Sequence, residues 1–407
     1  MPKKICIFSL AYYPQTVVGG AEVAIKEITD RIDPSDIEFH LITLGFDSDW
    51  PKTERFGNVT VHRIGFGKKK PSEEDLKKFP LHLNKHYFQI AAALKAWSLH
   101  RKYSFDAIWA MMAHSSGVPA ALFKIFCPRV PYILTLQEGD PTEYIEKLMR
   151  PVWPLFSRAF TSANVIQVIS HFLGDWAKRR GYTGPIEFIP NGANPRNFTA
   201  NYTPEELASY ETKVGKKPGE TLLVTTSRLA HKNAIDQVIR ALPLLPQTIR
   251  FVVVGGGPDE ALLKKLAQEL GVSERVVFIG QVDRTETPKY LKISDIYIRP
   301  SRSEGFGNSF ASAMAARLPI IATQVGGISD FLFDAKRNPD MPTTGWAVDV
   351  DSPEQIAQAV QDILQHPEQV QKVTETSYQL VFGTYNWDII AKNMRSRVFD
   401  IAFQKKV

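Results

Sequence analysis

Short runs rich in Val and Ile alternate with helix-length segments along almost the whole chain, and the alternation starts a second time near the middle. In the first half the expected strands are residues 4–9, 39–43, 59–63, 107–111, 132–135, 165–169 and 186–189. In the second half they are residues 222–227, 250–254, 276–279, 296–299 and 320–323. This pattern is typical of parallel sheets that helices cover on both faces. We therefore expect an α/β fold with two Rossmann-like, doubly wound domains.

A proline-rich polar segment separates the two alternations. Residues 191–219 contain Pro195, Pro204 and Pro218, and we interpret this segment as a linker or domain boundary. The first expected domain is residues 1–195 and the second is residues 196–385, which leaves a last helix at about residues 386–407. Two doubly wound domains facing each other would place the best ligand site in the cleft where the carboxyl ends of their strands meet.

The cysteine count limits the class of protein. The chain contains two cysteines, Cys6 and Cys127, which excludes a disulfide scaffold and a four-cysteine zinc site and is typical of a reduced, cytoplasmic compartment. Two lysines precede the apolar run of residues 5–13, as in a signal peptide, but the run ends at Pro14 without a cleavage site. We interpret it as a buried first strand.

The positive charge of the chain is concentrated in its first half. The net charge is +6, and residues 1–195 carry 24 Lys and Arg against 19 Asp and Glu. A basic excess is compatible with nucleic acid, an anionic membrane or a phosphorylated substrate. A solvated loop would explain the densest run, residues 68–78, equally well, because acidic residues interrupt it.

Two cations follow the first strand of the second domain. Arg228 and Lys232 lie four residues apart where that strand ends and a helix begins, so they can converge on one diphosphate, the arginine as a fork and the lysine as a point charge. A pair of ordinary surface cations would have the same spacing.

Glycine pairs follow two other strands. Gly19 and Gly20 come after the first strand and open a helix. Gly256 and Gly257 follow the strand at residues 250–254. Such glycines let the main chain approach a ligand, although a simple tight turn is an equal alternative. Neither pair forms the G-x-G-x-x-G pattern of nicotinamide or flavin enzymes.

The segment Arg299 to Phe310 is the most informative motif. A strand ends, Glu304 follows, and Gly305-Phe-Gly307 then opens a helix at Asn308. The amides of residues 305–308 suit a phosphate, whereas a carboxylate suits the hydroxyl groups of a sugar. Cations, amides and a carboxylate in one domain indicate a nucleotide-sugar site. The alternative is an N-terminal capping loop with Glu304 near the helix dipole.

These motifs together resemble the retaining glycosyltransferases of family 4, the glycosyl transferases group 1. The matching runs span nearly the whole chain in the family's order: Gly19-Gly20, Ile189-Pro-Asn191-Gly192, Thr226-Ser-Arg-Leu to Lys232-Asn233, Gly255-Gly-Gly-Pro258, Pro300-Ser to Glu304-Gly-Phe-Gly307, and Ala315-Ala to Val325-Gly-Gly327. The resemblance implies the GT-B fold, in which the final helix crosses back to the first domain.

The resemblance also implies roles for single residues. Arg228 and Lys232 would hold the donor diphosphate and stabilise the departing charge without a metal or other cofactor. Glu304 would contact the donor sugar. The remaining donor-site positions implied by the family are Gly19, Gly20, Asn191, Gly256, Gly257, Phe306, Gly307 and Asn308. Acceptors in the family are recognised by first-domain loops, here residues 66–83 and 138–148.

The chain departs from the family pattern at two positions. The family usually has a second glutamate eight residues after Glu304, for the nucleotide ribose, and Ser312 occupies that position here. The family often has a histidine in place of Gln137, which follows the strand at residues 132–135. Glutamine can hydrogen-bond a donor sugar but carries no proton. The front-face mechanism of retaining enzymes tolerates this, because the leaving phosphate takes the acceptor's proton.

We therefore expect a retaining, metal-independent transfer of a sugar from a nucleoside diphosphate sugar to a hydroxyl acceptor, such as a lipid-linked or cell-envelope glycan. The alternatives are a catalytically degenerate relative that binds a sugar or partner, which Ser312 favours, and a nucleotide-sugar epimerase. A nucleic-acid partner would rest on charge alone, and we expect none. We expect a cytoplasmic protein that can contact the inner face of an anionic membrane. Residues 150–160 are a candidate for this contact, although a core helix is the favoured interpretation of that segment.

Overall fold

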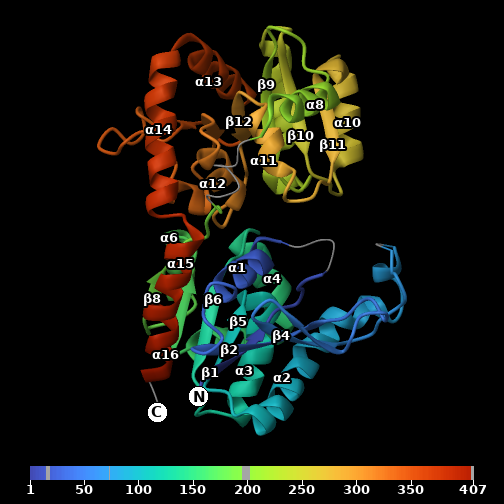
Figure 1. Ribbon diagram of the computed structural model, residues 1–407, viewed down its shortest axis with the longest axis vertical. Helices are drawn as coiled ribbons and strands as arrows, with labels where there is room; N and C mark the ends of the chain where they lie inside the picture. Colours follow the sequence, from blue (N-terminus) through green and yellow to red (C-terminus); the bar gives the residue numbers. More distant parts are fainter. Residues whose placement is uncertain (15–18, 73, 195–201, 405–407) are drawn as a thin grey trace. The chain divides into compact units, whose positions relative to one another are not determined.

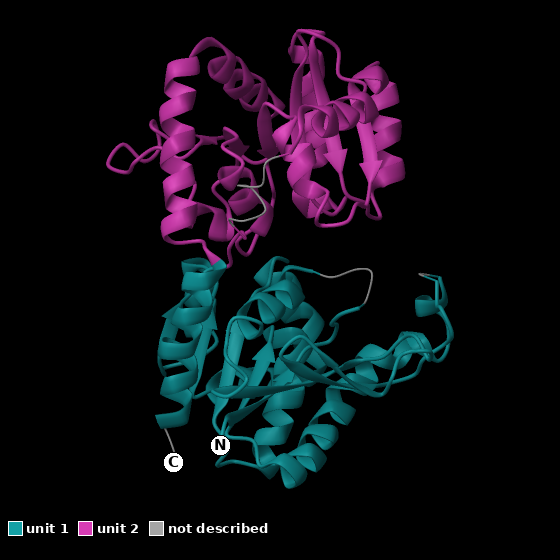
Figure 2. Ribbon diagram, in the orientation of Figure 1, with its two compact units in different colours: residues 1–190, 387–407 teal, residues 191–386 magenta. Residues whose placement is uncertain are grey.

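The chain, seen here as a computed structural model, is described for residues 1–14, 19–72, 74–194 and 202–404. It divides into two units, which Figure 2 colours separately. Unit 1 contains Met1–Pro190 and Trp387–Val407, and unit 2 contains Asn191–Asn386. The sequence put the same two divisions at residues 195 and 385, a few residues away.

Unit 1 is built on an eight-stranded sheet with the order β3-β4-β2-β1-β5-β6-β7-β8. The strands are β1 (Lys3–Phe8), β2 (Ile37–Leu44), β3 (Thr53–Phe56), β4 (Val59–Ile64), β5 (Ala107–Met111), β6 (Tyr132–Leu136), β7 (Val165–Val168) and β8 (Ile186–Phe188). All pairs are parallel except β3 with β4. The sequence did not predict β3, because this short edge strand alternates exposed and half-buried side chains and contains no apolar run.

Helices cover both faces of this sheet (Figure 1). They are α1 (Gly20–Thr29), α2 (Asn84–Tyr103), α3 (Val118–Phe126), α4 (Thr142–Met149), α5 (Trp153–Thr161) and α6 (His171–Arg179). Ile5 and Ile7 of β1 belong to the core beneath α1, whereas Phe8 contacts Phe123 of α3 with ring centroids 6.4 Å apart. A strand that is buried on both faces has a continuous run of apolar residues, and the parallel strands could therefore be predicted from the sequence.

The last helical segment of the chain belongs to unit 1. It comprises α15 (Trp387–Asn393), a π-helical turn (Met394–Phe399) and α16 (Asp400–Gln404). Phe399 lies in the unit 1 core, 5.3 Å from the Trp109 ring. Arg395 forms a bidentate ion pair with Asp36, with N–O distances of 2.5 and 2.9 Å.

Unit 2 has a six-stranded, fully parallel sheet with the order β11-β10-β9-β12-β13-β14. Its strands are β9 (Thr221–Thr226), β10 (Ile249–Val254), β11 (Val276–Gly280), β12 (Ile296–Arg299), β13 (Ile320–Ala322) and β14 (Trp346–Ala347). Its helices are α8 (Pro204–Val214), α9 (Ile235–Ala241), α10 (Glu260–Glu269), α11 (Thr287–Lys292), α12 (Asn308–Ala315), α13 (Pro353–Gln365) and α14 (Pro367–Gly383).

Two interpretations of single segments need correction. The expected linker at residues 191–219 contains the helix α8, with Thr203 as N-cap, Pro204 at the first turn and Gly215 in the left-handed region after its end. These residues are ordinary signals for the start and end of a helix, but their prolines were interpreted as signs of a linker. Pro195 lies outside the described residues. Residues 150–160 contain most of α5, whose Phe156 and Phe160 are fully buried. The membrane-contact alternative is therefore wrong for this segment, and the core helix that the sequence favoured is confirmed.

Each sheet has one point where the chain reverses its direction of strand addition. In unit 1 this point lies between β1 and β5, and in unit 2 it lies between β9 and β12. Open parallel sheets bind ligands outside the carboxyl ends of the strands at this switch point. The segments to inspect are therefore those that directly follow these four strands.

Candidate functional site

The switch point of unit 2 joins the two loops that carry the predicted cations and carboxylate. Arg228 is exposed after β9, and Lys232 lies in the 3-10 turn His231–Asn233. The carbonyl oxygen of Lys232 accepts hydrogen bonds from the amides of Arg302 at 2.7 Å and Ser303 at 3.4 Å. These main-chain bonds place Lys232 beside the loop that ends in Glu304. Among the described residues the Arg228 side chain forms no ion pair, so its charge is available to a ligand.

A buried arginine connects Glu304 with the loop of Arg228. Arg299, the last residue of β12, forms an ion pair with Glu304 and donates to Asn233 Oδ1 at 3.1 Å. Asn233 Nδ2 in turn donates to the carbonyl oxygen of Arg228 at 2.5 Å. Arg299 Nη1 also donates to Ser309 Oγ at 2.7 Å. Burial lowers the pKa of the Arg299 guanidinium, but Glu304 and Tyr297 outweigh burial and raise that pKa overall, so Arg299 stays charged.

The main chain around Glu304 is fixed from two sides. Gly305 N–H donates to Glu304 Oε1 at 3.2 Å, and Gly327 N–H donates to the Glu304 carbonyl at 3.0 Å. Gly326 has a φ of +55°, and a Cβ there would overlap the same carbonyl. Gly307 has a φ of +87° immediately before α12, where a Cβ would lie 2.5 Å from the Phe310 ring. Glycine is therefore required at both bends by the fold itself.

The predicted residues after Glu304 differ in what they can offer a ligand. The Phe306 side chain is buried, with ring centroids 5.2 Å from both Phe331 and Tyr385, so only its main chain could line a pocket. Asn308 is half-buried at the first turn of α12. Ser312 is half-buried one turn further on, and its hydroxyl donates to the Asn308 carbonyl at 3.4 Å.

The glycine turn after β10 packs against the loop of Arg228. Leu229 N–H donates to the Gly256 carbonyl at 3.0 Å. A Cβ at Gly257 would overlap the main chain of Leu229, and a Cβ at Gly255 would overlap that of Ser227. A Cβ at Gly256 would meet no atom within 4 Å. Gly257 therefore has a packing role, whereas Gly256 has open space beside it.

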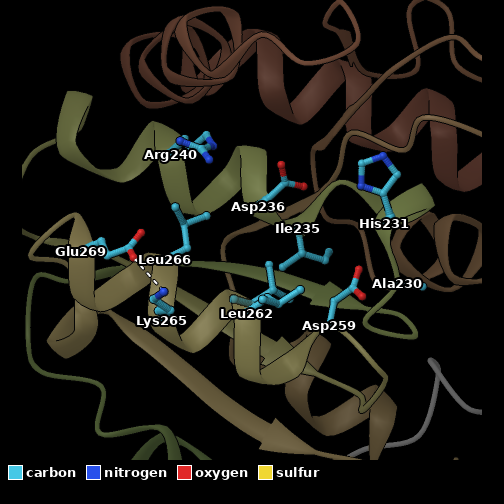
Figure 3. A pocket seen from close by; sticks show the side chains of 11 residues that line it. Ala230, His231, Ile235, Asp236, Arg240, Asp259, Leu262, Lys265, Leu266 and Glu269 are labelled. Carbon is cyan, nitrogen blue, oxygen red and sulfur yellow. Dashed lines mark ion pairs between the residues drawn. The ribbon is translucent and has the colours of Figure 1, made fainter.

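A separate cavity of about 330 Å³ lies between α9 and α10 (Figure 3). His231 and Asp236 stand on one side of it, and Lys265 is paired with Glu269 along α10. Asp236 accepts hydrogen bonds from Arg302 at 2.8 and 2.9 Å. The cavity does not include Arg228, Lys232 or Glu304, so it is not the site that the motifs predicted.

The predicted residues of unit 1 lie at the carboxyl edge of its sheet. Gly19 and Gly20 begin α1 at the switch point, and the Gly19 amide donates to Glu22 Oε2 at 2.8 Å. Gln137 follows β6, and its main-chain N–H donates a hydrogen bond to Glu138 Oε2 at 2.9 Å. Val18, the residue before this glycine pair, lies outside the described residues. Asn191 is buried and is the first residue of unit 2.

Two residues of this edge had no individual role assigned from the sequence, although Glu138 lies in the expected acceptor loop 138–148. Glu138 is buried and accepts a hydrogen bond from the Ala113 amide at 2.6 Å. His114 Nδ1 lies 3.5 Å from Glu138 Oε1. In unit 2 the motifs contained Arg299, Asn233 and Ser309, but the sequence assigned none of them a role. A lone arginine at a strand end or a histidine after an apolar run fits many structural roles, so only the folded arrangement distinguishes them.

Two family models match consecutive parts of the chain. The model described as Glycosyltransferase Family 4 matches residues 18–197, and the model described as Glycosyl transferases group 1 matches residues 208–380. Together they cover most of both units. The chain belongs to the group 1, family 4 glycosyltransferases.

Similar proteins agree with this assignment. An uncharacterized glycosyltransferase of Methanocaldococcus jannaschii is 25% identical over 96% of this chain and 97% of its own length. The alpha-monoglucosyldiacylglycerol synthase of Acholeplasma laidlawii is 25% identical over 82% of this chain and 83% of its own length.

Solved structures of this glycosyltransferase's fold include two whole-chain matches. Sucrose-phosphate synthase from Thermosynechococcus elongatus superposes with a TM-score of 0.80 at 21% identity, covering 98% of this chain and 99% of that one. Anabaena HepE in complex with UDP-glucose superposes with a TM-score of 0.76 at 16% identity, covering 98% and 99%. The fold class is GT-B, as the motifs implied, with two parallel-sheet α/β domains.

No helix in the part of the chain that the structure describes is both long enough and apolar enough to span a bilayer. Among the same described residues, no group of three or more His, Cys, Asp or Glu side chains lies close enough together to hold a metal ion.

Proposed function

We propose that this glycosyltransferase moves a sugar from a nucleoside diphosphate sugar to a hydroxyl group with retention of the anomeric configuration. The observation that carries the proposal is that the loop of Arg228 and Lys232 is hydrogen-bonded to the loop of Glu304 at the switch point of unit 2. Two cations and a fixed carboxylate match a donor with a diphosphate at one end and sugar hydroxyls at the other. The HepE complex with UDP-glucose supports a donor of this class.

Arg228 and Lys232 hold the diphosphate and stabilise the negative charge that grows on it as the sugar leaves. Fixed cations already supply this stabilisation, so the proposed reaction needs no metal and no other cofactor. Glu304 accepts hydrogen bonds from the donor sugar, and the ion pair with Arg299 holds its carboxylate in place. Gly256 and Asn308 offer main-chain and amide groups beside these side chains.

For unit 1 we propose contacts with the reacting groups by Gln137, Gly19 and Gly20, the positions that the family resemblance implies. In the front-face mechanism the bond between the anomeric carbon and the diphosphate oxygen breaks as the acceptor oxygen bonds to the same face. The proton of the acceptor hydroxyl goes to the departing diphosphate. Gln137 can hydrogen-bond the sugar in this scheme, and no proton has to pass through it.

A donor screen tests the proposal. Purified protein is heated with UDP-glucose, GDP-mannose, ADP-glucose or TDP-glucose, and donor hydrolysis is then measured for each hit. A ligand at 100 times its dissociation constant adds about 2.7 kcal/mol to the folded state, which gives a clear thermal shift. We expect a shift with one donor that disappears in Arg228→Ala, Lys232→Ala and Glu304→Ala.

The control variant is Lys265→Ala, a surface cation of the same unit that is paired with Glu269. It should keep the wild-type shift. Retention is then checked by NMR of the product's anomeric proton. If no donor shifts the wild-type protein, the catalytically degenerate alternative, which rests on Ser312, replaces the proposal. Conversion of the donor to its epimer would indicate the epimerase.

For the acceptor we propose a glycan or lipid-linked hydroxyl at an anionic membrane on its cytoplasmic side, and the outer face of α2 supports this. Five large apolar side chains lie along one stripe of that face, between 36% and 63% exposed: Leu83, Tyr87, Ile90, Leu94 and Trp97. The helix contains no acidic residue but carries Lys85, Lys95, Arg101 and Lys102. An exposed apolar stripe on a helix that carries lysines and arginines but no acidic residue fits an anionic lipid surface.

Vesicle flotation tests the membrane contact at low salt. We expect binding to phosphatidylcholine vesicles that contain phosphatidylglycerol and none to phosphatidylcholine alone. The variant Ile90→Glu/Leu94→Glu should lose binding, whereas Leu262→Glu, at an equally exposed apolar position of unit 2, should retain it. Equal binding of both variants would contradict a role for α2.

A further inference from the structure

The turn after β5 has two unusual backbone features at the switch point of unit 1. Met112 has a φ of +71° and a ψ of 131°, although it is not glycine. The next five residues, Ala113–Gly117, form a π-helix. A non-glycine residue in this region costs on the order of 1–3 kcal/mol and persists only where surrounding structure enforces it. Short π-helical turns are frequent at functional sites.

A buried carboxylate stabilises this turn. Glu138, at 1% exposure, accepts hydrogen bonds from the amides of Ala113 at 2.6 Å and Gln137 at 2.9 Å. Its Oε1 lies 3.5 Å from His114 Nδ1. The Glu138 side chain is fully buried, whereas 23% of the His114 side chain is exposed. Stabilising the turn does not explain one feature of Glu138. A partly exposed imidazole, that of His114, lies next to its buried carboxylate.

The orientation of the His114 ring follows from which of its atoms are buried. Nδ1 is buried and makes no hydrogen bond among the described residues, so the exposed part of the ring must be its other edge. A carboxylate near Nδ1 favours the tautomer with a proton on that nitrogen. The other nitrogen, Nε2, then presents a lone pair that can accept a hydrogen bond.

Further polar atoms around the turn lack partners. Gln89 Oε1, Ser116 Oγ and Tyr132 Oη are buried and form no hydrogen bond within the described part of the chain. Gln89 lies against the turn, because its Nε2 donates to the Ser115 carbonyl at 3.2 Å. Buried polar atoms without partners are rare in native proteins, and a cluster of them calls for an explanation such as water or a polar ligand.

We propose that this turn is the acceptor-binding site, in which His114 Nε2 accepts a hydrogen bond from a hydroxyl group of the acceptor. Glu138 is a positioning residue that fixes the tautomer and direction of the ring. The ligand class is a carbohydrate or polyol hydroxyl, which donates to Nε2 where an anion could not. This inference rests on the proposed transferase activity, and it assigns to unit 1 a group that recognises the acceptor rather than the donor.

The first test needs no acceptor. Protein labelled with ¹⁵N-histidine gives the tautomer of each ring by NMR, and His114→Gln identifies the signal. We expect the Nδ1–H tautomer for His114 in the wild type and a shift toward Nε2–H in Glu138→Gln. A predominant Nε2–H tautomer in the wild type would overturn the proposal.

The second test adds methyl α-D-glucopyranoside, methyl α-D-mannopyranoside or dioctanoylglycerol, with the donor found in the screen. We expect at least one probe to shift the His114 signal saturably and to accept sugar. In His114→Ala the KM of that probe should rise about tenfold or more, while the thermal shift given by the donor alone stays at the wild-type value. Glu138→Gln should raise the same KM less, and the control His171→Ala should not change it.

The outcomes separate the two proposals. If no donor raises the melting temperature of the wild-type protein, the transferase function itself is refuted. A wild-type KM for the accepted probe in His114→Ala, or no effect of any probe on the His114 signal, would refute the acceptor site alone. Because His114→Gln keeps a polar side chain of similar length, it shows whether any loss in His114→Ala comes from misfolding.

Discussion

Arg299 and Glu304 form an ion pair inside unit 2, five residues apart in the sequence and at opposite ends of the turn that leaves β12. The same guanidinium reaches Asn233 and Ser309. One buried charge thus holds the carboxylate that we assign to the donor sugar and, through Asn233, the main chain of the diphosphate-binding arginine. This link explains how two separate loops can keep one geometry.

Arg299→Met should leave Glu304 buried without its partner. Breaking one side of a buried ion pair costs about 3–5 kcal/mol, so urea unfolding of unit 2 should shift to lower denaturant, and donor binding should weaken with it. Arg299→Met/Glu304→Gln should recover much of the stability but not the donor binding. Unchanged stability in the single variant would show that the pair contributes little.

Gly256→Ala and Gly257→Ala should separate donor binding from packing. A methyl group at Gly257 overlaps the main chain of Leu229, whereas one at Gly256 meets nothing. We expect Gly257→Ala to lower the melting temperature and Gly256→Ala to leave it within about a degree, since surface changes without new contacts cost less than about 0.5 kcal/mol. Because we place Gly256 beside the donor, Gly256→Ala should bind the donor more weakly although its melting temperature without ligand is unchanged. A thermal-shift titration with the donor measures this loss of affinity.

Ser312→Glu should strengthen nucleotide binding. The position is half-buried on α12, and within the described part of the chain its hydroxyl bonds only the Asn308 carbonyl of its own helix. A carboxylate could accept hydrogen bonds from both ribose hydroxyls. We expect the dissociation constant for the preferred nucleoside diphosphate to fall about tenfold, or about 1.4 kcal/mol. Ser312→Gln is the control, and equal affinities for the three proteins, measured by calorimetry, would argue against a ribose site here.

His62 should make unit 1 sensitive to acid. Burial, together with the neighbouring His40, Lys95 and Lys102, lowers the pKa of His62 from 6.5 to about 4. The unfolded chain therefore binds a proton between these values that the folded chain does not. The contribution of neutral His62 to the free energy of unfolding is therefore complete above about pH 6.5. It is lost as the pH falls toward 4, and the loss is at most about 3 kcal/mol.

The melting temperature measured from pH 8 to pH 4 checks this prediction. The wild type should be level above pH 6.5 and decline below it, and His62→Gln should decline less over the same range. His62 Nε2 lies 3.1 Å from His40 Nδ1, so His40→Gln should raise the pKa of His62, which histidine NMR can follow. A slope that is equal in wild type and His62→Gln would assign the acid sensitivity to other groups.

Regular elements with a strong pattern could be predicted from the sequence. The parallel strands β1, β5 and β12 were located almost to the residue, because strands buried on both faces must be continuously apolar. The edge strand β3 and the helix α8 were missed, because their side chains are largely exposed. In such elements the pattern that reports burial is absent.

The sequence by itself determined the family, the two-domain α/β organisation and the candidate donor residues Arg228, Lys232 and Glu304. These depend on local patterns and on motif spacing, which the linear chain carries. Only the tertiary structure decided that Arg299 holds Glu304, that Phe306 turns into the core, and that His114 meets Glu138. Each of these is a contact between segments that the sheet brings together, and the energy of a buried charge or ring depends on neighbours that sequence distance does not specify.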